Sequence, residues 1–208
     1  MKNISVNIVI RNEAKRLPRL LNTLRGFDDI VVADQESTDN SVEICEKFGC
    51  RVLHDKASGF SESSRQLVMD NSKYEWILTL DADEFLTTRF YEDMRDFITM
   101  NIDCVLCCEA FIRRPRGADE LSDEYIMNIG RYIDIEHTSN PYTCRLYKKS
   151  AVNIGNKLHS GIGPKHLAIC LNCQYNGIVE IKSPEEHNID HARYKALIEG
   201  NYDAKIHK

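Results

Sequence analysis

Residues 76–84 read Trp76-Ile77-Leu78-Thr79-Leu80-Asp81-Ala82-Asp83-Glu84, an apolar run of strand length that ends in an acidic cluster. A short apolar run of this kind is typical of a strand with both faces buried. Asp81 and Asp83 follow where the chain leaves the sheet, and carboxylates this close repel each other unless a cation lies between them. A hard divalent ion with oxygen ligands suits them. The alternative is a turn with a helix cap, since Asp favours both.

The residues before this run alternate between strand-like and helix-like patterns. Apolar runs predict three earlier strands, at 5–10, 30–33 and 51–54. Apolar residues at helical spacing follow each of them, and Gly26 and Gly49 end the first two helices. Asn40 and Glu43 have the spacing of a capping box at the start of the second helix. Further elements are predicted at 63–71 and 90–98 as helices, and at 104–111 as a strand. The alternation predicts an α/β fold with a mostly parallel sheet flanked by helices.

From about Arg113 the alternation of strand-like and helix-like patterns ends. Residues 113–142 are polar and without a clear period, and only short strands at 143–147 and 178–181 and a helix at 190–198 are predicted after them. The 208 residues therefore suggest one domain in two parts: a regular α/β half at 1–112 and a smaller, irregular subdomain at 113–208.

Charge and cysteine content narrow the class of protein. Lys plus Arg number 27 against 32 Asp plus Glu, and the net charge of −5 argues against nucleic acid as a partner. The first apolar run is too short for a signal peptide, and no later run approaches a membrane span, so we expect a cytoplasmic protein. Its 8 cysteines are then expected to be free thiols. The C-x-x-C pairs Cys104/Cys107 and Cys170/Cys173 are read as core residues rather than zinc ligands.

Ligands of an open parallel sheet bind beyond the carboxyl ends of its strands. Polar residues follow three of the predicted strands: Arg11-Asn12-Glu13, Asp34 and the acidic cluster at 81–84. The chain has no G-x-G-x-x-G after its first strand and no G-x-x-x-x-G-K-[ST], which argues against a dinucleotide fold and excludes a P-loop.

Four motifs in order resemble the family 2 glycosyltransferases, which have the GT-A type fold. They are Arg11-Asn12-Glu13 after the first strand, Asp34 to Asp39 in a D-x-x-S-T-D pattern, Gly59-Phe60, and Asp81-Ala82-Asp83-Glu84. The chain is most similar to small bacterial members that build lipopolysaccharide core and related glycans. The resemblance implies a hexosyltransferase-type enzyme that uses a nucleotide-diphosphate sugar, inverts the anomeric carbon and transfers to a hydroxyl acceptor, either a glycan or a lipid-linked saccharide. It makes residues 1–112 the nucleotide-sugar-binding half and 113–208 the acceptor side.

The same resemblance implies a nucleotide-binding set, namely Ile10, Arg11, Asn12, Glu13, Asp34, Arg65, Asp81 and Ala82. Within this set Asp34 receives the base of the nucleotide. Asp83 and Asp81 form the D-x-D motif that faces a Mn²⁺ or Mg²⁺ ion, with Asp83 as the direct ligand. Arg145-Leu146-Tyr147-Lys148 is similar to a later R-L-F-R motif of the family.

An inverting transfer needs a base that takes the proton of the acceptor hydroxyl. Leu158-His159 resembles a V-H-E motif, but Ser160 stands in place of the Glu. His159 is one candidate base, because an imidazole titrates near neutrality. Glu109, expected at the end of the strand at 104–111, is the other.

Three alternatives stay open. The missing Glu at Ser160 allows a non-catalytic nucleotide-binding module. The basic cluster Arg113-Arg114-Pro115-Arg116 allows a glycosyltransferase with an unusual acceptor, such as a modified nucleic-acid base. A sugar-phosphate nucleotidylyltransferase would need a Gly-rich basic loop after its first strand, and Arg11-Asn12-Glu13-Ala14 is not one.

Overall fold

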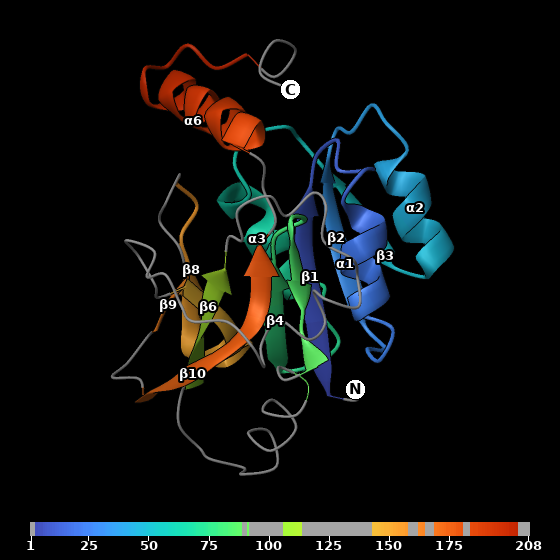
Figure 1. Cartoon of the computed structure of the whole chain (residues 1–208), viewed down its shortest axis with the longest axis vertical. Helices are drawn as coiled ribbons and strands as arrows, with labels where there is room; N and C mark the ends of the chain where they lie inside the picture. The colour runs from blue at the N-terminus through green and yellow to red at the C-terminus, as the bar shows by residue number, and fades with distance from the viewer. Residues whose placement is uncertain are drawn as a thin grey trace.

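A computed structural model describes residues 3–88, 91, 106–113, 143–157, 162–164, 169–180 and 184–203 (Figure 1). The strands are β1 (Ile4–Ile10), β2 (Ile30–Gln35), β3 (Arg51–Asp55), β4 (Trp76–Leu80), β5 (Glu84–Leu86), β6 (Leu106–Arg113), β7 (Thr143–Lys148), β8 (Val152–Ile154), β9 (Ile162–Pro164) and β10 (Ile169–Glu180). The helices are α1 (Leu17–Thr23), α2 (Ser41–Phe48), α3 (Glu62–Asp70) and α6 (Pro184–Ile198). No helix in these ranges is both long and apolar enough to cross a membrane.

Eight of the described strands form one sheet in the order β3-β2-β1-β4-β7-β6-β10-β5, and β8 pairs with β9 separately. The half made of β3, β2, β1 and β4 is entirely parallel. In the other half β7 runs antiparallel to both β4 and β6, whereas β10 is parallel to β6 and antiparallel to β5. The predicted α/β fold is confirmed. Because strands on both sides of residue 113 share this sheet, the two predicted parts belong to one layer.

Helices cover both faces of the parallel half, which is why β1, β2 and β4 are mainly apolar. Ile30 and Val32 of β2 pack in one cluster with the leucines of α1 and with Cys45 of α2. The alternate residues Val31 and Ala33 pack with Val68 of α3 in another. Since successive side chains of a strand point to opposite faces, α1 and α2 cover one face and α3 covers the other.

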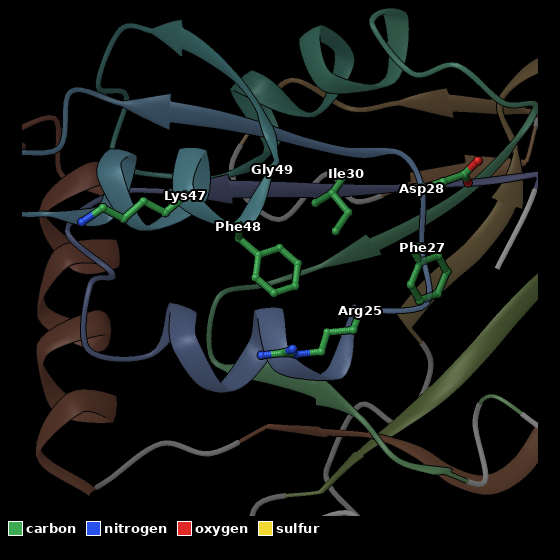
Figure 2. Close-up of a pocket in the computed structure, with 7 residues that line it drawn as sticks. All are labelled: Arg25, Phe27, Asp28, Ile30, Lys47, Phe48 and Gly49. Atoms are coloured by element: carbon green, nitrogen blue, oxygen red, sulfur yellow. The ribbon is translucent and has the colours of Figure 1, made fainter.

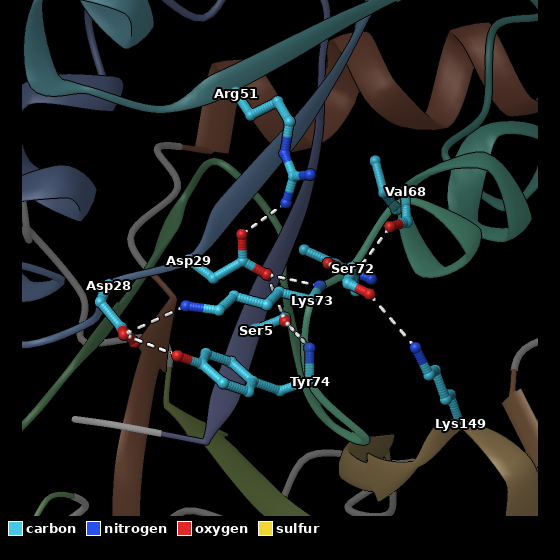
Figure 3. Close-up of polar contacts among 10 residues, drawn as sticks. Ser5, Asp28, Asp29, Arg51, Val68, Ser72, Lys73, Tyr74 and Lys149 are labelled. Carbon is cyan, nitrogen blue, oxygen red and sulfur yellow. Dashed lines mark hydrogen bonds and ion pairs between the residues drawn. The ribbon is translucent and has the colours of Figure 1, made fainter.

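The amino-terminal edge of the sheet is held by a polar network around Asp29, shown in Figure 3. Asp29 is only 7% exposed and accepts hydrogen bonds from the Ser5 hydroxyl, from the Lys73 backbone N–H at 2.8 Å and from Arg51 Nη2 at 2.5 Å. The Ser5 hydroxyl in turn accepts the Tyr74 backbone N–H at 3.0 Å. One carboxylate therefore ties the starts of β1, β2 and β3 to the turn before β4.

We expect Asp29→Ala to lower the free energy of unfolding by about 2–3 kcal/mol, because it leaves the buried Ser5 hydroxyl and the part-buried Lys73 N–H without their acceptor. Chemical denaturation measures this. Asp28→Ala is the matched control, since its exposed carboxylate contacts Tyr74 and Lys73 at the surface, and it should have a clearly smaller effect. Equal losses for the two variants would contradict the structural role of Asp29.

Several predicted elements have different boundaries in the structure. The strand predicted at 178–181 spans Ile169–Glu180, the helix predicted at 190–198 begins at Pro184, and β5, β8 and β9 were not predicted. The helix predicted at 90–98 lies outside the described residues except for residue 91. The predicted capping box is wrong, because Asn40 makes no side-chain cap hydrogen bond within the described part. Asp39 accepts the Ser41 N–H at 3.0 Å instead.

The predicted end of α2 is confirmed. Gly49 has a φ of 92°, and its N–H and that of Cys50 bond back to the carbonyls of Glu46 and Cys45. This is the glycine-terminated cap that the left-handed region allows. Cys45 and Cys50 are buried free thiols, as expected. Of the two C-x-x-C pairs, Cys104 lies outside the described residues.

Candidate functional site

The predicted nucleotide-binding residues gather at the carboxyl edge of the parallel half. Ile10, the last residue of β1, is the register partner of Asp34 in β2, and Ile8 is the partner of Leu80, the last residue of β4. The loop after β1, the end of β2 and the acidic cluster after β4 therefore lie side by side. The structure brings together Ile10, Arg11, Asn12, Glu13, Asp34, Arg65, Asp81, Ala82 and Asp83 around these strand ends and the start of α3.

The loop after β1 is held by the D-x-x-S-T-D motif. The backbone N–H groups of Asn12, Glu13 and Ala14 donate to the side chains of Ser37 (2.9 Å), Ser41 (2.7 Å) and Asp39 (3.1 Å) respectively. The Asn12 side chain accepts the Thr38 N–H at 2.7 Å in return. The polar residues of this motif, together with Ser41, thus fix the two loops that flank the ends of β1 and β2.

Both loops contain a strained residue. Asn12 and Glu36 each have a φ of 56°, the left-handed region that residues other than glycine rarely adopt. Such conformations persist where the surroundings impose them, and they cluster at binding sites. At Asn12 the reciprocal hydrogen bonds with Ser37 and Thr38 impose the conformation.

Asp34 is 3% exposed at the end of β2. Its two carboxylate oxygens accept the Ser37 N–H at 3.2 and 3.3 Å, and the exposed His54 places Nδ1 3.6 Å from Oδ2. A carboxylate offers about four acceptor positions. Asp34 therefore keeps lone pairs for a ligand N–H, as its predicted role requires.

Gln35 is a site residue that sequence reasoning missed. Its side-chain nitrogen lies 2.8 Å from Ser64 Oγ, 3.0 Å from Ser63 Oγ and 3.0 Å from the Phe60 carbonyl oxygen. These contacts hold the loop that contains Gly59-Phe60 against the end of β2. The sequence signal was an amide side chain directly after Asp34, and the structure shows that this side chain is buried.

Two buried arginines meet the acidic cluster after β4. Arg145 Nη2 lies 2.9 Å from Asp81 Oδ2 and also pairs with Glu84, while Arg65 Nη2 lies 3.5 Å from Asp81 Oδ1. Glu84 accepts the Asp81 backbone N–H at 2.9 Å. Arg145 comes from β7, which is antiparallel to β4, and so the R-L-F-R-like motif reaches the D-x-D motif across the sheet.

Burial and neighbouring charges shift the pKa values of Glu84 and Arg145 in this cluster. Desolvation raises the pKa of Glu84 well above its ordinary value, and Arg145 opposes that rise. For Arg145 burial acts in the opposite direction, but Glu84 and Asp81 outweigh it and raise the pKa further. We therefore treat Arg145 as charged.

The site can bind an anionic ligand together with a cation. In the described part of the chain, the buried Nε and Nη1 atoms of Arg145 have no hydrogen-bond acceptor, and phosphate is a preferred partner of a guanidinium group. No three His, Cys, Asp or Glu side chains converge among the described residues. An Mg²⁺-type ion needs only one or two carboxylates when phosphate oxygens and water complete its shell. Asp83, with Asp81 beside it, fits that partial set.

The roles of the two candidate bases stay predictions. His159 lies outside the described residues. Glu109 was predicted at the end of its strand, and this is wrong: β6 continues to Arg113, because Ile112 and Arg113 pair with Ile178 and Val179 of β10. Glu109 is therefore an interior residue of β6.

A pocket of about 490 Å³ lies elsewhere, near the amino-terminal ends of β2 and β3 (Figure 2). It is lined by Arg25, Phe27, Asp28, Ile30, Lys47, Phe48 and Gly49. None of the strand-end residues above contributes to it, so it is separate from the candidate site.

Comparisons with known proteins agree with this geometry. The chain is 34% identical over 97 residues to an uncharacterised glycosyltransferase of Rickettsia felis, a match that covers 45% of this chain and 33% of the relative. It is 28% identical over 110 residues to the glycosyltransferase SunS of Bacillus subtilis, covering 50% of this chain and 26% of SunS. The chain thus spans about a third of the length of the curated relatives it matches.

The fold is similar to that of S. aureus TarS residues 1–349 in complex with UDP. The TM-score is 0.59 at 18% sequence identity, and the match covers 99% of this chain and 68% of the TarS chain. This likeness confirms the GT-A type fold. A family model described as glycosyl transferase family 2 matches residues 5–155. The match includes all four motifs and both arginines of the acidic cluster, and the chain therefore belongs to glycosyl transferase family 2.

Proposed function

We propose that this chain is a metal-dependent, inverting glycosyltransferase that moves a sugar from a nucleotide-diphosphate sugar to a hydroxyl acceptor. The observation that carries the proposal is the convergence of Asp34, the strained Asn12 loop and the Asp81–Arg145 pair at one edge of the sheet. The acceptor, a glycan or lipid-linked saccharide, and a cytoplasmic location are parts of the same proposal.

The nucleotide lies along the strand ends in this proposal. Asp34 accepts an N–H of the base, and the loop formed by Arg11, Asn12 and Glu13 lines the base and ribose. Arg65 and Arg145 sit on either side of Asp81, where their charges attract the diphosphate. TarS, whose fold is similar, was crystallised with UDP, which makes a uridine nucleotide the first donor to try.

Asp83 would hold a Mn²⁺ or Mg²⁺ ion, with Asp81 beside it. Such an ion, when bound, neutralises the charge that develops on a departing diphosphate. Asp83 is the better direct ligand because Asp81 is already shared between two guanidinium groups. The proposal therefore gives Asp81 mainly the task of orienting Arg65 and Arg145.

In the transfer itself an acceptor hydroxyl attacks the anomeric carbon, the bond from that carbon to the diphosphate oxygen breaks, and the hydroxyl proton passes to a base. His159 remains the first candidate for the base and Glu109 the second. A base of this kind contributes about a hundredfold or more to turnover.

Transfer or hydrolysis assayed with a panel of UDP- and GDP-sugars tests the proposed function. Turnover of any donor supports an enzyme, whereas nucleotide binding without turnover would favour the non-catalytic module. An acceptor panel that includes saccharides and modified nucleobases separates the unusual-acceptor alternative. Membership of family 2 leaves a nucleotidylyltransferase without support.

Asp34→Ala is expected to weaken the binding of a nucleoside diphosphate by about ten- to a hundredfold, because a hydrogen bond to a charged group contributes about 1.5–3 kcal/mol. Calorimetry with the free nucleotide measures this without an acceptor. Asp34→Asn is the companion variant, since it retains an acceptor for the Ser37 N–H. Weakening by Ala but not by Asn would assign Asp34 to the turn rather than to the base.

A further inference from the structure

The chain after α6 returns to the candidate site. Gly200 has a φ of 73°, its N–H bonds to the Leu197 carbonyl at 3.3 Å, and the Asn201 N–H bonds to the Ala196 carbonyl at 2.9 Å. This pattern is a Schellman cap, which ends a helix and reverses the chain. Figure 1 shows α6 beyond the carboxyl ends of the parallel strands. After the reversal, Tyr202 contacts Arg11 and Gly59, which follow β1 and β3 at the edge where the nucleotide is proposed to bind.

Tyr202 makes two contacts there, one with each of two loops. Its phenol oxygen accepts a hydrogen bond from Arg11 Nη1 at 2.5 Å. Its ring lies directly on Gly59, since a Cβ added at Gly59 would meet three ring atoms at 2.5–2.8 Å. Side chains do not approach a Cβ so closely, and Gly59 also has a φ of 86°. The glycine of the Gly59-Phe60 motif is therefore the surface on which Tyr202 packs.

The order of the strands shows that β2 lies between the two loops that Tyr202 contacts. Arg11 follows β1 and Gly59 follows β3, while β2 runs between those strands. Two strand spacings amount to about 10 Å, a gap that a tyrosine and an arginine side chain bridge together. Tyr202 therefore spans the end of β2, and Asp34 is the acid at that end.

The loop after β3 is thus fastened from two sides. Gln35 holds its Ser58 hydroxyl and Phe60 carbonyl from the end of β2, and Tyr202 covers Gly59. A loop that is fixed before binding loses less conformational entropy when the ligand arrives.

We propose that Tyr202 is a positioning residue of the donor site: it holds the loops after β1 and β3 at the spacing that the base of a nucleoside diphosphate requires beside Asp34. This rests on the proposed function and adds a part of the chain that lies outside the matched family region. The residues at 199–203 then belong to the nucleotide-binding machinery, although they are some 90 residues or more beyond the α/β half in sequence.

Calorimetric titration of UDP and of GDP into the wild-type chain, Tyr202→Ala, Tyr202→Phe and Tyr74→Ala tests the proposal. We expect Tyr202→Ala to weaken the better of the two nucleotides about tenfold. Tyr202→Phe keeps the ring on Gly59 and should lose about threefold or less. Tyr74→Ala is the matched control, because it also removes one phenol hydrogen bond but at the opposite edge, and its affinity should equal that of the wild type. Thermal unfolding confirms that all variants are folded at the titration temperature.

A cycle with Gly59→Ala isolates the contact itself. The backbone strain of an alanine at this φ is common to both backgrounds, so it cancels in the comparison. Gly59→Ala should weaken nucleotide binding at least about threefold more in the wild-type background than in Tyr202→Ala, since the ring must move only in the former. Unchanged affinity in Tyr202→Ala, or no coupling in the cycle, would overturn the proposal. Tighter binding would also overturn it, by showing that Tyr202 blocks the base position. Failure of the wild-type chain to bind either nucleotide would instead contradict the proposed function on which this inference depends.

Discussion

Replacing Asp83 with alanine is expected to reduce sugar transfer by at least about a thousandfold, which corresponds to about 4 kcal/mol of lost transition-state stabilisation. The reason is that Asp81 and Asp83 have different proposed roles in the acidic cluster. Asp81 is held between Arg65 and Arg145, so Asp83 is the carboxylate assigned to the cation. Steady-state turnover with the best donor of the panel measures the effect, and thermal unfolding shows whether the variant remains folded.

Metal removal should reproduce the loss. Excess chelator is expected to stop transfer by the wild-type chain, and added Mn²⁺ or Mg²⁺ should restore it, whereas Asp83→Ala should stay inactive with either ion. Asp70→Ala, an exposed acid at the far end of α3, serves as the control and should keep wild-type turnover. Full activity of the wild-type chain in chelator would remove the metal from the mechanism.

The parallel half could be read from sequence because local patterns determine it. The strand at 76–80 has the predicted bounds, and β1, β2 and β3 differ from prediction by a residue or two. β1, β2 and β4 are mainly apolar runs buried between helices, and β3 contributes Val52 and Leu53 to the same two clusters. The position of the candidate site could be predicted from the same patterns, since parallel strands bring their carboxyl ends to one edge of the sheet.

The rest of the site depends on contacts between distant parts of the chain, which local patterns do not encode. Arg145 meets Asp81 across 64 positions because β7 inserts antiparallel beside β4. Tyr202 reaches Arg11 across 191 positions only because a glycine cap turns the chain after α6. The prediction that Glu109 ends its strand was wrong for the same reason, since pairing with β10 extends β6 to Arg113.

Arg145→Met is expected to lower the free energy of unfolding by about 3–5 kcal/mol, the loss typical of removing one partner from a buried ion pair. Arg145 is 3% exposed and Glu84 is 1% exposed. Both also contact Asp81, and these contacts join β5 and β7 to the end of β4. Without the guanidinium group, the Asp81 N–H is the one donor that the described residues leave to the buried Glu84 carboxyl. Chemical denaturation measures the loss.

Two further variants separate the charge from the packing. Glu84→Gln together with Arg145→Met removes both charges, and we expect it to be more stable than Arg145→Met alone, because no uncompensated carboxylate remains buried. Arg51→Met removes an arginine that also pairs with a buried aspartate, but its side chain is 47% exposed, so water replaces much of the interaction and the loss should be far smaller. If Arg145→Met lost no more stability than Arg51→Met, the buried pair would not be what holds the acidic cluster in place. Nucleotide affinity is expected to fall in Arg145→Met in either case, because the guanidinium group is proposed to attract the diphosphate.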